Sequence, residues 1–229
     1  YWKDRLCSAC LSSTLIWGVL RRRALRNRAL SVLCYHTLGP DQGGIDGWTV
    51  LRVGDFRAQL ADLRAHYDIV SLDEALNDPA DNERPRAVIT FDDGDQGLHS
   101  HLLPILHDTP FPVTIYVATA QFETGQPFWF DRVVNAWQNA GEIHIEDFGR
   151  WQIPGTAGKA RWAVLGEILQ ALKNTDPETR ETLADQIAAQ GAAPAQAVLG
   201  PMRLEALQQL AATPGVTIGA HSHGHELLD

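Results

Sequence analysis

Two short clusters of polar residues combine side chains that bind metal ions with side chains that move protons. The first is Thr90-Phe-Asp-Asp-Gly94, in which two adjacent carboxylates follow an apolar run. The second is His221-Ser-His-Gly-His225, which holds three of the nine histidines of the chain. Neutral imidazole is the commonest metal ligand in proteins, and neighbouring carboxylates repel unless a positive group lies near them. Each cluster also has a plainer explanation: a helix N-cap for the aspartates and a solvated polar turn for the histidines.

Taken together, the two clusters indicate a catalytic metal site. His221 and His225 are four residues apart, so one helical turn would bring both imidazoles to the same side. Two histidines and one carboxylate with open coordination positions are typical of a catalytic zinc site rather than a structural one. The second aspartate then remains free to take a proton from water, whose pKa falls to about 7 on Zn²⁺. This arrangement predicts hydrolysis of an amide or an ester.

The elements that must position these clusters are strands that alternate with helices. Apolar runs of strand length precede both clusters, at 87–91 and 216–220, and further strands are predicted at 30–36, 69–70 and 112–117. Between them, the spacing of apolar residues predicts a helix over 56–67, and a capping box at Ser71–Glu74 opens a short helix. A helical stretch over 98–106 must kink or restart at Pro104. This alternation predicts an α/β fold with parallel strands.

Residues 120–200 depart from this alternation. Gln126–Arg132 leads into a helix, and Lys159–Leu172 has helical periodicity. A capping box at Thr175–Glu178 predicts a helix that runs to about Gln190. Residues 192–197 have the composition of a linker. We therefore interpret 120–200 as a helical insertion.

With its motifs in this order, the chain resembles the polysaccharide deacetylases, the NodB-homology domain of carbohydrate esterase family four. Thr90–Gly94 is similar to the first motif of that family, and His221-Ser-x-x-His225 is similar to the second. The resemblance covers about residues 28–229, through Tyr35-His36, Phe56–Leu60, Tyr67–Leu76, Pro127–Asp131 and Gly219–His221. It implies a distorted (β/α) barrel and, as substrate, an N-acetylated amino sugar of a polysaccharide or glycolipid.

The resemblance also implies a role for each residue of the two motifs. Asp93, His221 and His225 correspond to ligands of a divalent metal, and Asp92 corresponds to the catalytic base. Zn²⁺ is the expected metal, although Co²⁺, Ni²⁺ or Fe²⁺ would suit the same ligands. His223 is not a ligand in the family, and we expect it to face solvent.

The later motifs of the family do not occur in this sequence. They supply an arginine near the base, a donor for the oxyanion and a histidine that acts as the general acid. We expect them beyond Asp229, so we interpret residues 30–229 as a deacetylase domain that is truncated at its C-terminus, and we assign no general acid. Two other functions stay open: hydrolysis of another non-peptide C–N bond, as in a cyclic imide or ureide, and a non-catalytic role in binding carbohydrate or metal.

Several further side chains are candidates for contact with substrate. His36 and Trp129 are candidate substrate-binding residues, and burial in the core is the alternative for each. We expect Asp95 to be a solvated turn carboxylate. We expect Asp131 to form a local ion pair with Arg132.

Composition limits the class of protein and its partners. The chain has 229 residues, of which 45% are hydrophobic and 21% charged, as in ordinary globular proteins. A net charge of -9 argues against nucleic acid as a partner. Three cysteines, Cys7, Cys10 and Cys34, are too few for a disulfide framework.

The first 29 residues differ from the rest because they are rich in arginine. We predict a basic amphipathic segment over 1–29, with peripheral membrane contact through residues 5–28. Its apolar run is shorter than the roughly 20 residues that span a bilayer. A cytoplasmic or membrane-peripheral location is favoured, and an export signal upstream of Tyr1 stays open.

Overall fold

The computed structural model describes residues 30–77, 84–155, 158–191 and 199–225. The basic segment 1–29, with Cys7 and Cys10, and the linker at 192–197 lie outside these residues, so the expectations for them stay predictions. Among the described helices, none combines the length and the apolar character that crossing a membrane requires.

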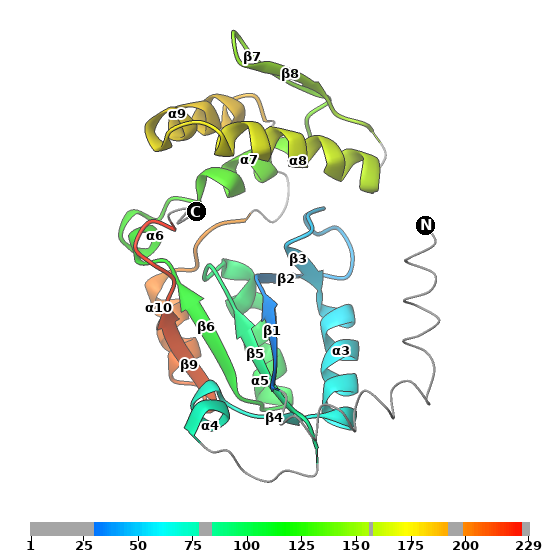
Figure 1. Cartoon of the computed structure of the whole chain (residues 1–229), viewed down its shortest axis with the longest axis vertical. Coiled ribbons are helices and arrows are strands. Elements are labelled where there is room, and N and C mark those ends of the chain that lie inside the picture. Colours follow the sequence, from blue (N-terminus) through cyan, green and yellow to red (C-terminus); the bar gives the residue numbers. More distant parts are fainter. Residues whose placement is uncertain (1–29, 78–83, 156–157, 192–198, 226–229) are drawn as a thin grey trace.

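The base of the molecule is a parallel sheet of five strands (Figure 1). Its order is β1-β5-β6-β9, with β4 beside β5. The strands are β1 (Leu30–Tyr35), β4 (Asp68–Ile69), β5 (Arg86–Phe91), β6 (Val113–Val117) and β9 (Val216–Ala220). The predicted α/β class with parallel strands is confirmed. A closed barrel is not, because in the described part of the chain β1 and β9 are the two edges of an open sheet.

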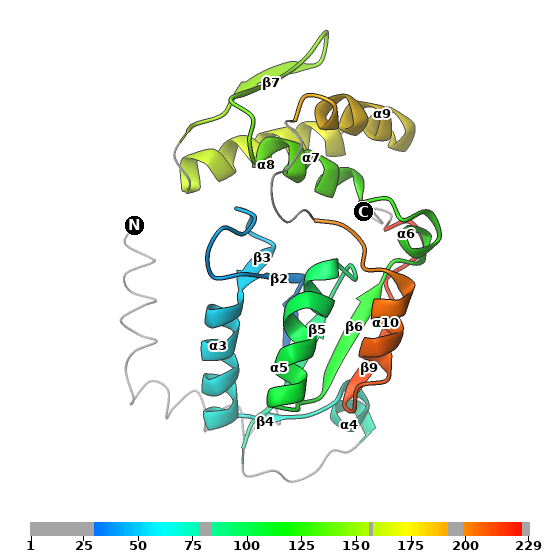
Figure 2. The same ribbon diagram turned by 180° about the vertical axis from the view of Figure 1, so that it is seen from behind.

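Three helices cover one face of this sheet: α3 (Val53–His66), α5 (Leu103–Asp108) and α10 (Leu204–Ala211) (Figure 2). Their apolar side chains form a common core with the strands, in which Phe56, Ile89 and Ile115 are completely buried. A π-helical segment, η1 (Leu98–Leu102), comes before α5, so the helix restarts near Pro104 as predicted.

The short helix α4 (Leu72–Asn77) begins at the predicted capping box. The Ser71 N–H donates to Glu74 Oε2 at 2.8 Å, and the Glu74 N–H donates to Ser71 Oγ at 3.1 Å. These reciprocal bonds satisfy donors that the first turn of a helix leaves unpaired.

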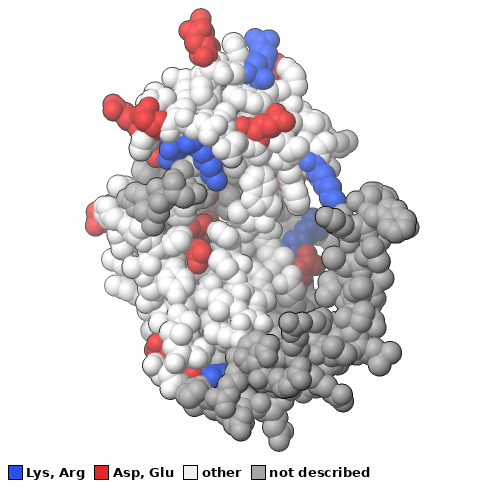
Figure 3. All heavy atoms as spheres, in the orientation of Figure 1, with Lys and Arg blue, Asp and Glu red and all other residues white. Residues whose placement is uncertain are grey.

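A second group of elements lies over the carboxyl ends of the strands (Figure 1). We call it the helical layer: α7 (Trp129–Trp137), the hairpin β7 (Glu142–Ile145) and β8 (Gly149–Gln152), α8 (Lys159–Lys173) and α9 (Pro177–Ala188). It has a core of its own, centred on Trp137, Ile143 and Ile168. In Figure 3, charged side chains of both signs gather mainly over this layer.

The helical layer differs in detail from the sequence prediction. The hairpin was not predicted, and neither was α6 (Thr119–Thr124), which connects β6 to the layer. The N-cap of α9 is Asp176, which accepts from the Thr179 N–H at 3.0 Å. The predicted cap, Thr175, instead donates through its hydroxyl to the Leu172 carbonyl at 2.7 Å.

A small parallel pair, β2 (Thr37–Gly39) with β3 (Val50–Arg52), follows β1. It lies between the sheet and the helical layer (Figure 1). His36 and Thr49 therefore stand where the two parts of the molecule meet.

Candidate metal centre and its cavity

The sheet order brings the two polar clusters together. β5 and β9 lie on either side of β6, and parallel strands end at the same edge. Asp93 adopts a left-handed backbone with φ of 73°, and Gly94 follows with φ of 75°. This tight turn separates the two carboxylates, so that Asp93 faces the histidines and Asp92 faces β1.

The histidines meet through a tight turn, so the predicted helical turn is wrong. β9 ends at Ala220, and both Ser222 and His225 have left-handed φ angles, of 59° and 56°. The His225 N–H donates to Ser222 Oγ at 3.0 Å, which holds the turn closed. As a result the imidazole rings of His221 and His225 lie 4.9 Å apart.

Asp93 lies between the two imidazoles. Its Oδ1 is 3.5 Å from His221 Nε2 and 3.2 Å from His225 Nε2, and one donor atom from each residue lies within 4.8 Å of the others. Asp93 Oδ1 is buried and makes no hydrogen bond of normal geometry. The Asp93 carboxylate raises the pKa of His225 because it favours the charged imidazole. A buried carboxylate oxygen that faces two imidazole nitrogens, without a hydrogen bond of normal geometry, fits the donor set of a divalent metal.

Asp92 has a different environment. Cys34 Sγ of β1 lies 3.2 Å from Asp92 Oδ2 and donates to it. Burial, together with the Asp92 carboxylate, raises the pKa of the Cys34 thiol to about 11. The thiol therefore stays protonated at neutral pH and remains a donor. Sequence reasoning missed this contact; Cys34 pairs with Thr90 in the β1–β5 register, two residues before Asp92.

The remaining histidine of the cluster, His223, is exposed, as expected. Its Nδ1 lies 2.9 Å from Thr119 Oγ1, and its carbonyl accepts from the Ala120 N–H at 2.9 Å. It therefore anchors the turn to the start of α6 instead of joining Asp93.

Aromatic rings that lead into the helical layer hold His225 from the other side. The ring of Phe128 is 4.8 Å from the His225 imidazole, and that of Phe130 is 5.2 Å away. The two phenyl rings also stack on each other at 4.8 Å. Sequence reasoning did not assign this role to them.

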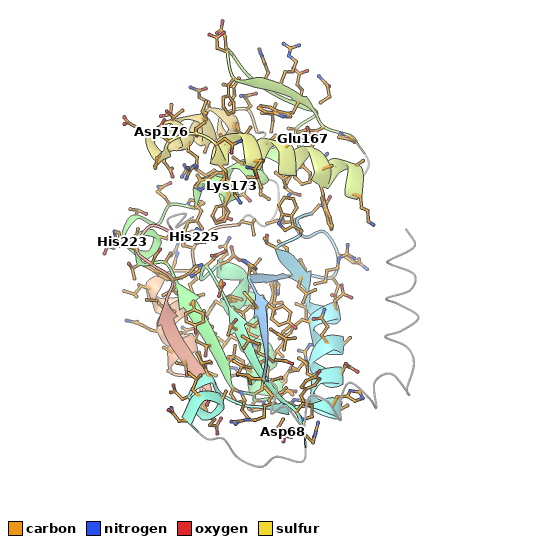
Figure 4. The ribbon with its side chains drawn as sticks, viewed as in Figure 1. Asp68, Glu167, Lys173, Asp176, His223 and His225 are labelled. Carbon is orange, nitrogen blue, oxygen red and sulfur yellow. The ribbon has the colours of Figure 1, made fainter. Side chains whose placement is uncertain are left out.

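A cavity of about 180 Å³ extends from the metal centre to the helical layer. Asp93 and His225 line it on the sheet side, and α8 lines it on the opposite side with Leu165, Leu169 and Lys173. Figure 4 labels Lys173 on the helical layer and His225 below it.

Both candidate substrate-binding residues, His36 and Trp129, line this cavity. Trp129 is only 8% exposed, and the guanidinium of Arg180 lies 5.5 Å from its ring centre. Trp129 thus belongs to the core of the layer and to the cavity wall at once.

Asp95 is buried, so the expectation of a solvated carboxylate is wrong. It accepts from the Gly97 N–H at 2.7 Å, from the Gly200 N–H at 2.8 Å and from the Thr37 hydroxyl. These bonds tie three segments together beneath the cavity. Burial raises the pKa of Asp95.

The expected ion pair between Asp131 and Arg132 is also wrong. Arg132 pairs with Glu181 and, at 3.1 Å, with Asp185 of α9. Asp131 is 8% exposed and lines the cavity. Burial raises its pKa well above the usual range, and the nearby carboxylates of Asp95 and Asp93 raise it further.

Comparison with known proteins places this geometry in a family. A family model described as Polysaccharide deacetylase matches residues 80–229, which include both polar clusters. The chain belongs to the polysaccharide deacetylase family. The matched residues include the helical layer, whereas β1 and α3 lie before them. No curated protein sequence matches the chain.

Solved structures similar to this deacetylase-family chain include three that cover more than half of it. A de-N-acetylase from Aggregatibacter actinomycetemcomitans is 18% identical over 62% of this chain and 51% of its own, with a TM-score of 0.37. IcaB from Ammonifex degensii is 23% identical over 69% of this chain and 80% of its own, with a TM-score of 0.37. The deacetylase PplD from Streptococcus pyogenes is 17% identical over 83% of this chain and 91% of its own, with a TM-score of 0.35. The chain thus spans about half the length of the first of these structures.

Proposed function

We propose that this polysaccharide deacetylase-family chain is a metal-dependent hydrolase that removes N-acetyl groups from amino sugars of a polysaccharide or glycolipid. The observation that carries the proposal is the convergence of Asp93, His221 and His225, within 4.8 Å of one another, at the edge of the sheet where Asp92 also lies. Family membership supplies the reaction class and the N-acetylated glycan substrate.

The three converging residues would hold the metal, for which we propose Zn²⁺. When bound there, a divalent cation would act as a Lewis acid toward the amide carbonyl and would lower the pKa of water to about 7. Asp93 Oδ1, which is buried without a hydrogen bond of normal geometry, is the side-chain atom whose burial such a charge would compensate.

Asp92 is the base in this proposal. It takes one proton from the attacking water while the water oxygen bonds to the amide carbon. The C–N bond then breaks and its electron pair goes to the nitrogen, which takes a proton from solvent and leaves as the free amine. Acetic acid, which ionises to acetate, is the second product, and Asp92 returns its proton to solvent. The Cys34 thiol donates to Asp92 Oδ2 and leaves the other oxygen of the carboxylate for the proton. Because Asp92 is not one of the three converging residues, its lone pairs stay available for the proton.

Acetate release tests this proposal. The full chain, with Zn²⁺ added, should release acetate from N-acetylglucosamine oligomers, lose that activity in a chelator and regain it when Zn²⁺ is restored. A cyclic imide and a cyclic ureide, offered in parallel, should stay intact. Acetate release that persists after complete metal removal would contradict the proposal, as would cleavage of the cyclic amides alone.

A further inference from the structure

Asp131 is a buried carboxyl that the proposed mechanism does not use. It comes from α7 of the helical layer, is 8% exposed, and lines the same cavity as Asp93 and His225. It also lines an adjoining smaller hollow with His36 and Gln121. A carboxyl rarely lies this deep in a protein without a partner that compensates for its burial.

No such partner is a cation. Among the described side chains, no lysine or arginine forms an ion pair with Asp131, since Arg132 pairs with α9. After burial, the carboxylates of Asp95 and Asp93 raise the pKa of Asp131 most. A carboxyl group can accept a hydrogen bond whether or not it is ionised, and so it matches the hydroxyl of an uncharged sugar.

The position of Asp131 in the first turn of α7 satisfies only part of the hydrogen-bonding capacity of its carboxyl. Asp131 is the third residue of α7, and the backbone N–H of Phe128, just before the helix, acts on its carboxyl and lowers its pKa. One N–H can use only one of several acceptor positions on the two oxygens. Asp131 also lines the cavity, so acceptor positions remain for a ligand there.

The cavity has the size of one ring and walls of mixed chemistry. An apolar cavity of about 150 Å³ can hold a benzene molecule, so the cavity of about 180 Å³ has room for a single six-membered ring. Val134, Leu165, Leu169 and Leu199 give it apolar walls. Such walls suit the C–H faces of a pyranose, whereas Asp131 suits a hydroxyl on its edge.

We propose that Asp131 is a substrate-binding residue that hydrogen-bonds a ring hydroxyl of the N-acetylated amino sugar seated in this cavity. The inference rests on the proposed function for the identity of the sugar. It assigns recognition of the sugar ring to the helical layer and leaves the acetamido group to the metal centre.

Two small ligands separate recognition of hydroxyls from general binding. N-acetylglucosamine has the ring, the acetamido group and the hydroxyls, whereas N-cyclohexylacetamide keeps a six-membered ring and the acetamido group without hydroxyls. Their dissociation constants are measured by NMR titration of the Zn²⁺-loaded full chain carrying Asp92→Asn, which should block turnover. Asp131→Ala should weaken binding of the sugar about 10-fold, as expected for the loss of a buried hydrogen bond. The same variant should change the dissociation constant of N-cyclohexylacetamide by no more than about 2-fold.

Three further variants complete the test. Asp131→Asn, which keeps the size of the side chain and an oxygen that accepts a hydrogen bond, should bind the sugar within about 3-fold of the parent. Glu167→Ala, which removes an exposed carboxylate from α8 outside the cavity, should bind both ligands normally. Leu169→Trp, which fills the cavity from the opposite wall, should weaken both ligands, and it replaces Asp131→Ala as the test if that variant does not fold. Equal effects of Asp131→Ala on both ligands, or unchanged binding in Leu169→Trp, would overturn the inference.

Acetate release by the wild-type chain separates this inference from the proposed function. If the wild-type chain releases acetate but Asp131→Ala binds the sugar as tightly as the parent, the inference alone would be overturned. Selective loss of sugar binding in Asp131→Ala, without acetate release by the wild-type chain, would overturn the proposed function alone.

Discussion

The sheet and the helical layer divide the site between them. The sheet ends supply Asp92, Asp93, His221 and His225, and the helical layer supplies the opposite wall of the cavity. Each part has its own hydrophobic core. The reactive groups thus lie in tight turns directly after parallel strands, whose order brings these turns together, whereas the groups that would select a substrate lie on helices and connecting segments. We therefore expect that substitutions can change metal binding and catalysis separately from substrate binding.

The largest effect is expected in the core of the helical layer. Trp137 is completely buried there, with the guanidinium of Arg161 4.2 Å from its ring centre. Trp137→Ala should lower the free energy of unfolding of the layer by about 3–5 kcal/mol, through lost burial and a cavity.

Hydrogen exchange resolved by segment measures where this loss falls. If the two cores are separate, protection should fall in α7, α8 and α9 more than in β5 and β6. An equal loss of protection in β5 and β6 would show that the two parts unfold as one unit and would remove the basis of the comparison.

On the sheet side, Asp93→Ala should cause the next largest effect. Loss of a partner outside the ligand shell already lowers metal affinity by about 10- to 100-fold. Removal of the carboxylate between the two imidazoles should therefore lower Zn²⁺ affinity by at least about 100-fold. Competition with a chromophoric chelator measures the affinity, and Glu167→Ala on the exposed side of α8 is the control. Affinity unchanged in Asp93→Ala would exclude this residue as a ligand.

A smaller effect should reveal where the two parts touch. Phe130 packs on the His225 imidazole at 5.2 Å, so Phe130→Leu should loosen that ring and lower Zn²⁺ affinity by about 10-fold. Phe148→Leu, a matched change elsewhere in the layer, should leave the affinity unchanged, because Phe148 packs on Trp151 instead. If both variants bind Zn²⁺ like the wild type, the layer does not support the metal centre.

The smallest effect concerns Cys34 beside Asp92. Alkylation of Cys34 by iodoacetamide, followed by peptide mass spectrometry, should be half-maximal near pH 11 in the folded chain, matching a pKa of about 11. In denaturant the midpoint should fall to about 8.5, and Asp92→Asn should lower it in the folded chain.

The raised pKa of Cys34 also makes the stability of the folded chain depend on pH. Because the folded pKa is raised, the contribution of Cys34 to stability is complete below about pH 8.5 and is lost as the pH rises toward 11. A folded midpoint near 8.5 would mean that Cys34 does not contact the Asp92 carboxylate.

The same contrast explains what could be predicted from the sequence. The strands before both clusters are short runs of apolar and β-branched residues, which are typical of buried strands. Their bounds in the structure lie within a residue or two of the prediction. The closeness of Asp93, His221 and His225 was expected, because their motifs occur together in one family. The turn that joins the histidines was not, since it depends on left-handed φ angles at Ser222 and His225, a backbone region that residues other than glycine seldom adopt.

The helical layer was harder to predict because its chemistry depends on tertiary contacts. Arg132 is adjacent to Asp131 in the sequence, yet helix geometry directs its side chain to α9. Neighbouring residues on a helix do not face each other, so a sequential pair is poor evidence of an ion pair. Asp131 became a candidate only when its burial and its place on the cavity wall were known.

In the proposed mechanism the two adjacent aspartates have different roles, Asp93 in holding the metal and Asp92 in moving the proton. Acetate release by Zn²⁺-loaded Asp92→Asn, measured on protein whose metal content is determined in the same sample, tests it most directly. We expect this variant to bind Zn²⁺ with an affinity within about 3-fold of the wild type and to release acetate at least about 100-fold more slowly, in line with the loss of a general base. Metal-loaded Asp92→Asn that releases acetate at the wild-type rate would contradict it.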